Sequence, residues 1–193
     1  MTMTKLKLGV VVGSNRRDSI NRKLAQALAR LGADRFEAVF LKVDDFPLYN
    51  QDLEGDLPAP VKRFKTEAAT CDAFLFVTPE HNRSIPALLK NAIDWGSRPY
   101  GTSVWTGKPA ATTGTSGGAI STAVAQQHLR QILGNFVGMH VFGGEAYVAF
   151  KPELIDAQGG VGDENVRAFL KTFIDNFAAF AARFAQARAE AAA

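Results

Sequence analysis

Apolar and polar residues form two alternating patterns along the chain. Short runs rich in Val, Leu, Ile and Phe are typical of buried strands, and each is followed by apolar residues that recur with the period of an amphipathic helix. The predicted strands span residues 6–12, 36–43, 73–77, 108–113 and 139–142. The predicted helices cover residues 20–31, 61–68, 85–93 and 119–134, and a long final segment with apolar positions from 166 to 184.

Five strand–helix units in this order predict a three-layer, doubly wound α/β domain with a parallel five-stranded sheet. Five strands suit the flavodoxin-like strand order 2-1-3-4-5 better than the six-stranded dinucleotide-binding order. The run from Ala73 to Val77 is apolar without a break, as expected for a central strand covered on both faces. In this order the loops after Val12 and Val77 flank the switch point, where open α/β sheets bind ligands.

The composition limits the class of protein. With 193 residues, 47% of them hydrophobic, residues 1–193 are expected to form a single domain, with residues 186–193 frayed at its end. Lys and Arg (22) barely exceed Asp and Glu (19), and no basic run suggests a nucleic-acid partner. No apolar run reaches the roughly 18 residues of a membrane span, and no signal peptide is seen, so a cytoplasmic location is expected. The single cysteine, Cys71, excludes an internal disulfide.

The first loop, from Gly13 to Asn21, indicates a phosphate site. It lacks both the G-x-G-x-x-G of dinucleotide folds and the G-x-x-x-x-G-K-[ST] of P-loops. It offers two hydroxyls, a guanidinium, an amide and the free N–H groups of a helix start, which together favour a phosphomonoester. These groups belong to Ser14, Ser19, Arg16 and Asn21. The alternative is a solvated loop in which Ser19 only caps the helix.

The central loop, residues 78–83, has groups suited to a flat heterocycle. Pro79 stiffens the backbone, and Glu80 and Asn82 offer mixed hydrogen-bonding groups. Ser84 is expected to be the N-cap of the following helix, with Pro86 in its first turn. His81 could act as a general base. The histidines at positions 81, 128 and 140 lack metal-ligand spacing, so no metal is expected. His128 and Arg130 are interpreted as a solvated or subunit-contact face.

The third loop, Gly114-Thr-Ser-Gly-Gly118, matches the G-x-S-x-G of a nucleophile elbow. A hydrolase of that class needs an acid and then a histidine after the serine. No Asp or Glu lies between Ser116 and the last histidine, His140, so the order of a catalytic triad is not met. Ser116 and Gly117 are therefore interpreted as ligand contacts in a loop whose glycines allow close approach.

Five motifs in order carry a family resemblance. They are Gly13-Ser-x-Arg-x-x-Ser-x-Asn21, Thr78-Pro-Glu-x-Asn-x-Ser-x-Pro86, Leu89-Lys-Asn-Ala-Ile-Asp-Trp95, Gly107-Lys-Pro109 and Gln127-His-Leu-Arg-Gln-Ile-Leu133. Together they resemble the NADPH-dependent FMN reductases of the flavodoxin-like superfamily, and most closely the bacterial quinone and chromate reductases. The resemblance implies bound FMN, NADPH or NADH as reductant, and a ping-pong transfer to a small-molecule acceptor such as a quinone, chromate, an azo compound or free flavin. It also implies a homodimer or homotetramer.

The resemblance also implies roles for single residues. The FMN phosphate would be held by the first loop, at Ser14, Arg16, Ser19, Ile20 and Asn21. The isoalloxazine would be lined by Pro79, Glu80, His81, Asn82 and Arg83, with Ser116 and Gly117 closing the other side. Arg83 or Arg98 would favour NADPH over NADH. No side chain is assigned a catalytic role, because the flavin itself supplies the redox chemistry.

The sequence departs from the family pattern at two places. The family often has Tyr where this chain has His81, and Gly144 stands where the family often has Pro before Glu145. Two other functions stay open on the residues alone. A non-enzymatic flavodoxin-type electron carrier is disfavoured by the net charge of +3, because such carriers are usually strongly acidic. A serine esterase using Ser116 rests only on the third loop.

Overall fold

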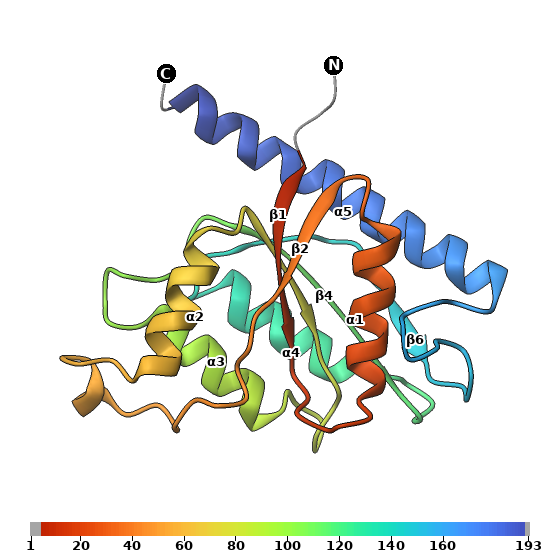
Figure 1. Cartoon of the computed structure of the whole chain (residues 1–193), viewed down its shortest axis with the longest axis horizontal. Helices are drawn as coiled ribbons and strands as arrows, with labels where there is room; N and C mark the ends of the chain where they lie inside the picture. Colours follow the sequence, from red (N-terminus) through yellow and green to blue (C-terminus); the bar gives the residue numbers. More distant parts are fainter. Residues whose placement is uncertain (1–4, 192–193) are drawn as a thin grey trace.

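The structure is a computed structural model that describes residues 5–191, so residues 1–4 and 192–193 lie outside the description. A twisted sheet stands between two layers of helices (Figure 1). The elements are β1 (Leu6–Val12), α1 (Ile20–Leu31), β2 (Phe36–Phe40), η1 (Gln51–Leu53), α2 (Ala59–Ala69), β3 (Ala73–Val77), α3 (Ala87–Ser97), β4 (Pro109–Ser116), α4 (Ala123–Gly134), β5 (His140–Val141), β6 (Tyr147–Ala149) and α5 (Glu164–Ala191).

The strand order confirms the predicted flavodoxin-like topology. The path through the sheet is β2-β1-β3-β4-β5, and every pair is parallel. The fifth position holds two short strands rather than one. β5 pairs with the start of β4 at Pro109 and Ala110, and β6 pairs with its end from Gly114 to Ser116. The two strands thus follow one another along the same edge of β4.

Apolar side chains build a core on each side of the sheet. One core lies between the sheet and the helices α1 and α5, and the other between the sheet and α2, α3 and α4. All five residues of β3 are buried, as the unbroken apolar run predicts. The two cores hold β1, β3 and β4 in place, so that their carboxyl ends meet at one edge of the sheet, the lower edge in Figure 1.

The ends of several elements differ from the prediction. β2 ends at Phe40 instead of position 43, and α4 begins at Ala123 instead of position 119. The segment before α4 is a turn, in which the Ser121 N–H donates to Gly118 O and the Ser121 φ is 51°. β4 continues to Ser116 because β6, which was not predicted, supplies a partner strand.

The predicted N-cap at Ser84 is wrong. The helix α3 begins at Ala87, with Pro86 at its N-cap position and no side-chain cap. The backbone of Ser84 pairs instead with His81, and its hydroxyl lies 2.8 Å from His128 Nδ1. Ser84 therefore belongs to the turn that precedes the helix.

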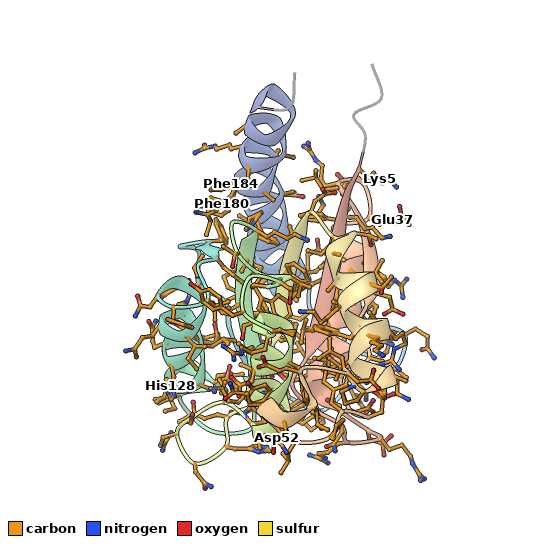
Figure 2. All side chains as sticks on the ribbon, turned by 90° about the vertical axis from the view of Figure 1, so that its left-hand side faces the viewer. Lys5, Glu37, Asp52, His128, Phe180 and Phe184 are labelled. Atoms are coloured by element: carbon orange, nitrogen blue, oxygen red, sulfur yellow. The ribbon has the colours of Figure 1, made fainter. Side chains whose placement is uncertain are left out.

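The last helix carries the predicted apolar stripe. Leu170, Ile174 and Phe177 are fully buried against the sheet. Phe169, which was predicted to belong to the apolar stripe of the core, is instead 44% exposed. Phe180 and Phe184, whose ring centroids are 5.0 Å apart, pack beside β5, where the Phe184 ring stacks on His140 with centroids 4.3 Å apart (Figure 2). The backbone is helical to Ala191. Fraying of residues 186–193 stays a prediction, and its last two positions lie outside the described residues. No helix within residues 5–191 has the length and apolarity to cross a membrane.

Candidate functional site

Three loops at the carboxyl edge of the sheet enclose a cleft with a volume of about 470 Å3. They follow β1, β3 and β4, as the predicted switch point requires. All predicted site residues except Asn82 and Arg83 line the cleft, namely Ser14, Arg16, Ser19, Ile20, Asn21, Pro79, Glu80, His81, Ser116 and Gly117. The sequence interpretation missed Gly13, Asn15, Pro86, Ala87, Leu88 and Thr115, which also line it. Gly13, Asn15 and Thr115 are adjacent in sequence to predicted site residues, and residues 86–88 follow the central loop, so sequence proximity could have predicted them.

The starts of the three loops lie in direct backbone contact at the carboxyl ends of β1, β3 and β4. The Thr78 N–H donates to Thr113 O at 2.9 Å, and the Gly13 N–H donates to Val77 O at 2.8 Å. A Cβ on Gly114 would lie 2.0 Å from Thr78 O, far inside any allowed contact. A glycine is therefore needed at position 114 so that β4 can pass this close to the central loop.

The N-terminus of α1 faces the cleft and favours negative charge. Ser19 is its N-cap, and its hydroxyl accepts from the Arg22 N–H at 3.2 Å. The first turn contains no acidic residue, and the N–H groups of Ile20 and Asn21 have no intrahelical acceptor. Ser14 is nearly buried at the cleft wall, while Arg16 is exposed. The positive end of the α1 dipole, the Ser14 hydroxyl and the Arg16 guanidinium thus lie at one end of the cleft.

Asn21 joins the first loop to the third. Its amide nitrogen donates to Thr115 O and its amide oxygen accepts from the Thr115 N–H, both at 3.0 Å. The side chain is 2% exposed. Asn21 lines the cleft, but the oxygen and one proton of its amide are used to hold the start of α1 against the end of β4.

Residues 81–84 form a tight turn with both central residues in the left-handed region. Asn82 has φ 50° and Arg83 has φ 62°, and the backbones of His81 and Ser84 exchange hydrogen bonds of 3.0 and 2.9 Å. This is the geometry of a type I′ turn, which favours Asn and Gly. The turn carries the side chains of Asn82 and Arg83 out into solvent, away from the cleft lining.

The carboxylate of Glu80 is bound within the protein. It is 9% exposed, accepts from Arg83 Nη1 at 2.8 Å and accepts from the Ala125 N–H at 3.1 Å. The Ala125 N–H is one of the free donors at the start of α4, whose N-cap residue Thr122 makes no side-chain cap. Glu80 therefore caps α4 from another loop while it also lines the cleft.

The side chains of His128 and Arg130 also form hydrogen bonds that fix segments next to the cleft. The exposed His128 meets Ser84, so a second contact joins the central loop to α4. Arg130 was interpreted as a solvated or subunit-contact residue, but it donates to the carbonyls of Phe142 and Gly144 at 2.6 and 2.7 Å. Burial lowers the pKa of its guanidinium. Arg130 thus fixes the connection between β5 and β6.

Ser116 shows no sign of a nucleophile. Its hydroxyl donates to Ser121 O at 2.7 Å and accepts from the Gly118 N–H at 3.3 Å. No histidine contacts it within residues 5–191, so an esterase mechanism lacks its base. The same residues contain no group of three or more His, Cys, Asp or Glu side chains placed to hold a metal.

The family model described as NADPH-dependent FMN reductase matches residues 6–153, which include all three loops of the cleft. The chain belongs to the NADPH-dependent FMN reductase family. The predicted family is thereby confirmed, and so is the prediction that the chain is an NAD(P)H-dependent reductase enzyme.

Relatives of this FMN reductase family member match nearly its whole length. A 2-hydroxy-1,4-benzoquinone reductase from a Burkholderia species is 48% identical over 175 residues, which cover 91% of this chain and 96% of the relative. A quinone reductase from Pseudomonas putida is 46% identical over 175 residues, with coverages of 90% and 93%. A solved structure of FerB, a flavoenzyme NAD(P)H:(acceptor) oxidoreductase from Paracoccus denitrificans, is 43% identical, has a TM-score of 0.88, and matches 93% of this chain and 98% of its own.

Proposed function

We propose that the protein is an FMN-dependent NAD(P)H oxidoreductase whose acceptors are quinones. The observation that carries the proposal is the cleft of about 470 Å3, in which an acid-free helix N-terminus lies at one end and the central loop at the other. A long, flat molecule with a phosphate tail matches this arrangement of charge and shape. Bound FMN supplies a group that accepts hydride from a nicotinamide and passes electrons to an acceptor.

The first loop is proposed to hold the phosphate of FMN. The N–H groups of Ile20 and Asn21 and the hydroxyl of Ser14 can donate hydrogen bonds, and Arg16 adds a positive charge. Ser19 contributes by capping α1, which fixes the direction of these N–H groups. The fit is supported by the absence of any acidic residue in the first turn, because a carboxylate there would compete with the phosphate.

The central and third loops are proposed to enclose the isoalloxazine. Pro79, Pro86 and Leu88 give the cleft an apolar wall, and Gly117 leaves open space at its rim.

The acceptor is proposed to be a quinone because the two relatives of highest identity above are named as quinone reductases. A hydroxylated benzoquinone is the first substrate to test, since the 48% identical relative is named for one. Chromate, azo compounds and free flavin are further proposed acceptors. Reductant and acceptor would use the same open side of the cleft in turn, which gives ping-pong kinetics. We further propose that residues 1–193 form one domain and that the protein is a homodimer or homotetramer. Its proposed location is the cytoplasm.

The test begins with the colour of the purified protein. A bound flavin spectrum that bleaches on anaerobic titration with NADPH and returns on addition of 2-hydroxy-1,4-benzoquinone is expected. Steady-state rates at several quinone concentrations should give parallel double-reciprocal lines. A preparation that stays colourless in excess FMN would overturn the proposal. Flavin that bleaches only with a chemical reductant, and not with NAD(P)H, would indicate an electron carrier instead.

A further inference from the structure

A second cavity lies beside the cleft, at the carboxyl ends of β1 and β2. It has a volume of about 300 Å3 and is lined by Val12, Ser14, Arg22, Phe40, Leu41, Lys42, Val43 and Asp44. Ser14 lines both cavities, so the two adjoin at the beginning of the first loop. The proposed binding of FMN uses neither Arg22 nor Lys42.

Positive charge prevails around this second cavity. The Arg22 guanidinium makes no ion pair or side-chain hydrogen bond with any residue from 5 to 191. The Lys42 ammonium lies 3.2 Å from Asp45, but that carboxylate also accepts hydrogen bonds of 2.9 and 3.0 Å from Arg63. One carboxylate thus serves two cations, and Arg63 above all lowers the pKa of Asp45 to about 2. Asp44 is the single acidic residue of the lining.

The arginines that the sequence favours for recognising NADPH are already paired. Arg98 donates to both carboxylate oxygens of Glu54, at 2.6 and 3.3 Å. Arg83 donates to Glu80 at 2.8 Å. A phosphate could reach either guanidinium only by displacing a carboxylate. Arg22 requires no such exchange, and it borders a cavity.

We propose that Arg22 and Lys42 bind the 2′-phosphate of NADPH in this second cavity, an inference that rests on the proposed NAD(P)H-dependent function. Arginine and lysine are the side chains that bind a phosphate dianion most strongly. In dinucleotide-binding α/β folds an acidic residue selects the ribose 2′-hydroxyl, and an arginine accommodates the 2′-phosphate. Here Lys42 and Asp44 lie in the segment after β2 and Arg22 approaches from α1, so two cations outnumber the one carboxylate that would favour a 2′-hydroxyl. The ribose phosphate would enter past Ser14, and the nicotinamide end would extend into the adjoining cleft.

The test uses the FMN-loaded protein and two nucleotide fragments that differ only in the 2′-phosphate. By calorimetry, the unaltered protein should bind 2′,5′-ADP roughly tenfold or more tightly than 5′-AMP, the range expected for a charge-assisted contact. Arg22→Gln and Lys42→Gln should each weaken 2′,5′-ADP binding by about tenfold, and the double variant should lose the preference. The KM for NADPH should rise by the same factor, while the KM for NADH stays within about twofold.

Arg17→Gln is the matched control, because it removes the same charge from the first loop but lies outside both cavity linings. It should leave the nucleotide preference unchanged. Equal binding of the two fragments by the unaltered protein would overturn the inference, as would a preference that survives in the double variant. Parallel loss of FMN affinity in Arg22→Gln and Lys42→Gln would also overturn it, since the cations would then serve the flavin phosphate. Absence of FMN binding by the unaltered protein would count against the proposed function. The titration of the apo-protein with the two nucleotide fragments would still measure whether the second cavity prefers a 2′-phosphate.

Discussion

The first and central loops of the cleft differ in how their side chains are used. Side chains 15–18 of the first loop are exposed and make no ion pair or side-chain hydrogen bond with any residue of the described chain. In the central loop Thr78 bonds Pro79 O, Glu80 binds Arg83 and Ala125, and Ser84 meets His128. We infer from this difference that the first loop offers a ligand free side chains in addition to its backbone N–H groups, whereas the polar side chains of the central loop mainly fix the shape of that loop.

The largest expected effect comes from the backbone contact beneath the central loop. Gly114→Ala would place a Cβ 2.0 Å from Thr78 O, a backbone atom that cannot move aside alone. We expect a loss of about 3 kcal/mol or more in the free energy of unfolding, measured by urea denaturation. Gly117→Ala is the control, because nothing lies within 4 Å of its added Cβ. A Gly114→Ala variant as stable as the Gly117→Ala variant would contradict the inference that β4 and the Thr78 backbone are held too close together for a Cβ at position 114.

The next effect tests the cap that the central loop supplies to α4. Glu80→Ala leaves the Ala125 N–H without its acceptor and Arg83 without its partner. A loss of about 2 kcal/mol in unfolding free energy is expected, and Glu80→Gln should lose under about 1 kcal/mol because it keeps an acceptor. Thermal unfolding of the apo-protein measures both. If Glu80→Ala instead weakened FMN binding with stability unchanged, Glu80 would contact the ligand directly and the comparison of the two loops would fail.

The first loop should show the opposite behaviour. Arg16→Ala is expected to weaken FMN binding by about tenfold, since a charge-assisted contact to the phosphate is lost. The unfolding free energy of the apo-protein should stay within about 0.5 kcal/mol, because surface side chains without partners contribute little. Fluorescence titration with FMN, and with riboflavin as the phosphate-free comparison, measures the first quantity. Equal weakening for FMN and riboflavin would show that Arg16 does not contact the phosphate.

The difference between the loops also explains what the sequence could predict. Strand order and the first loop follow from local signals: β-branched runs, helical periodicity and donors at a helix start. The role of Glu80 could not be predicted, because its partner Ala125 is 45 positions away and depends on where α4 begins. The same holds for Asn21, whose amide bonds the backbone at Thr115, 94 positions away. The fifth strand was predicted at residues 139–142 and is found as β5, whereas the three residues of β6 are too few to give a pattern.

The smallest expected effect lies in the turn itself. Asn82 has φ 50°, a region that glycine occupies without steric cost, and no side-chain hydrogen bond of Asn82 to any of residues 5–191 would be lost on substitution. Asn82→Gly should therefore change the free energy of unfolding by no more than about 0.5 kcal/mol in either direction, because Asn already tolerates this region and the freedom that glycine adds to the unfolded chain offsets the small strain that it relieves. Asn82→Ala is the matched comparison and should lose about 1 kcal/mol, since alanine is strained at positive φ. Urea denaturation of the apo-protein measures both. If Asn82→Gly and Asn82→Ala had the same stability, the left-handed turn would not be what holds the central loop in shape.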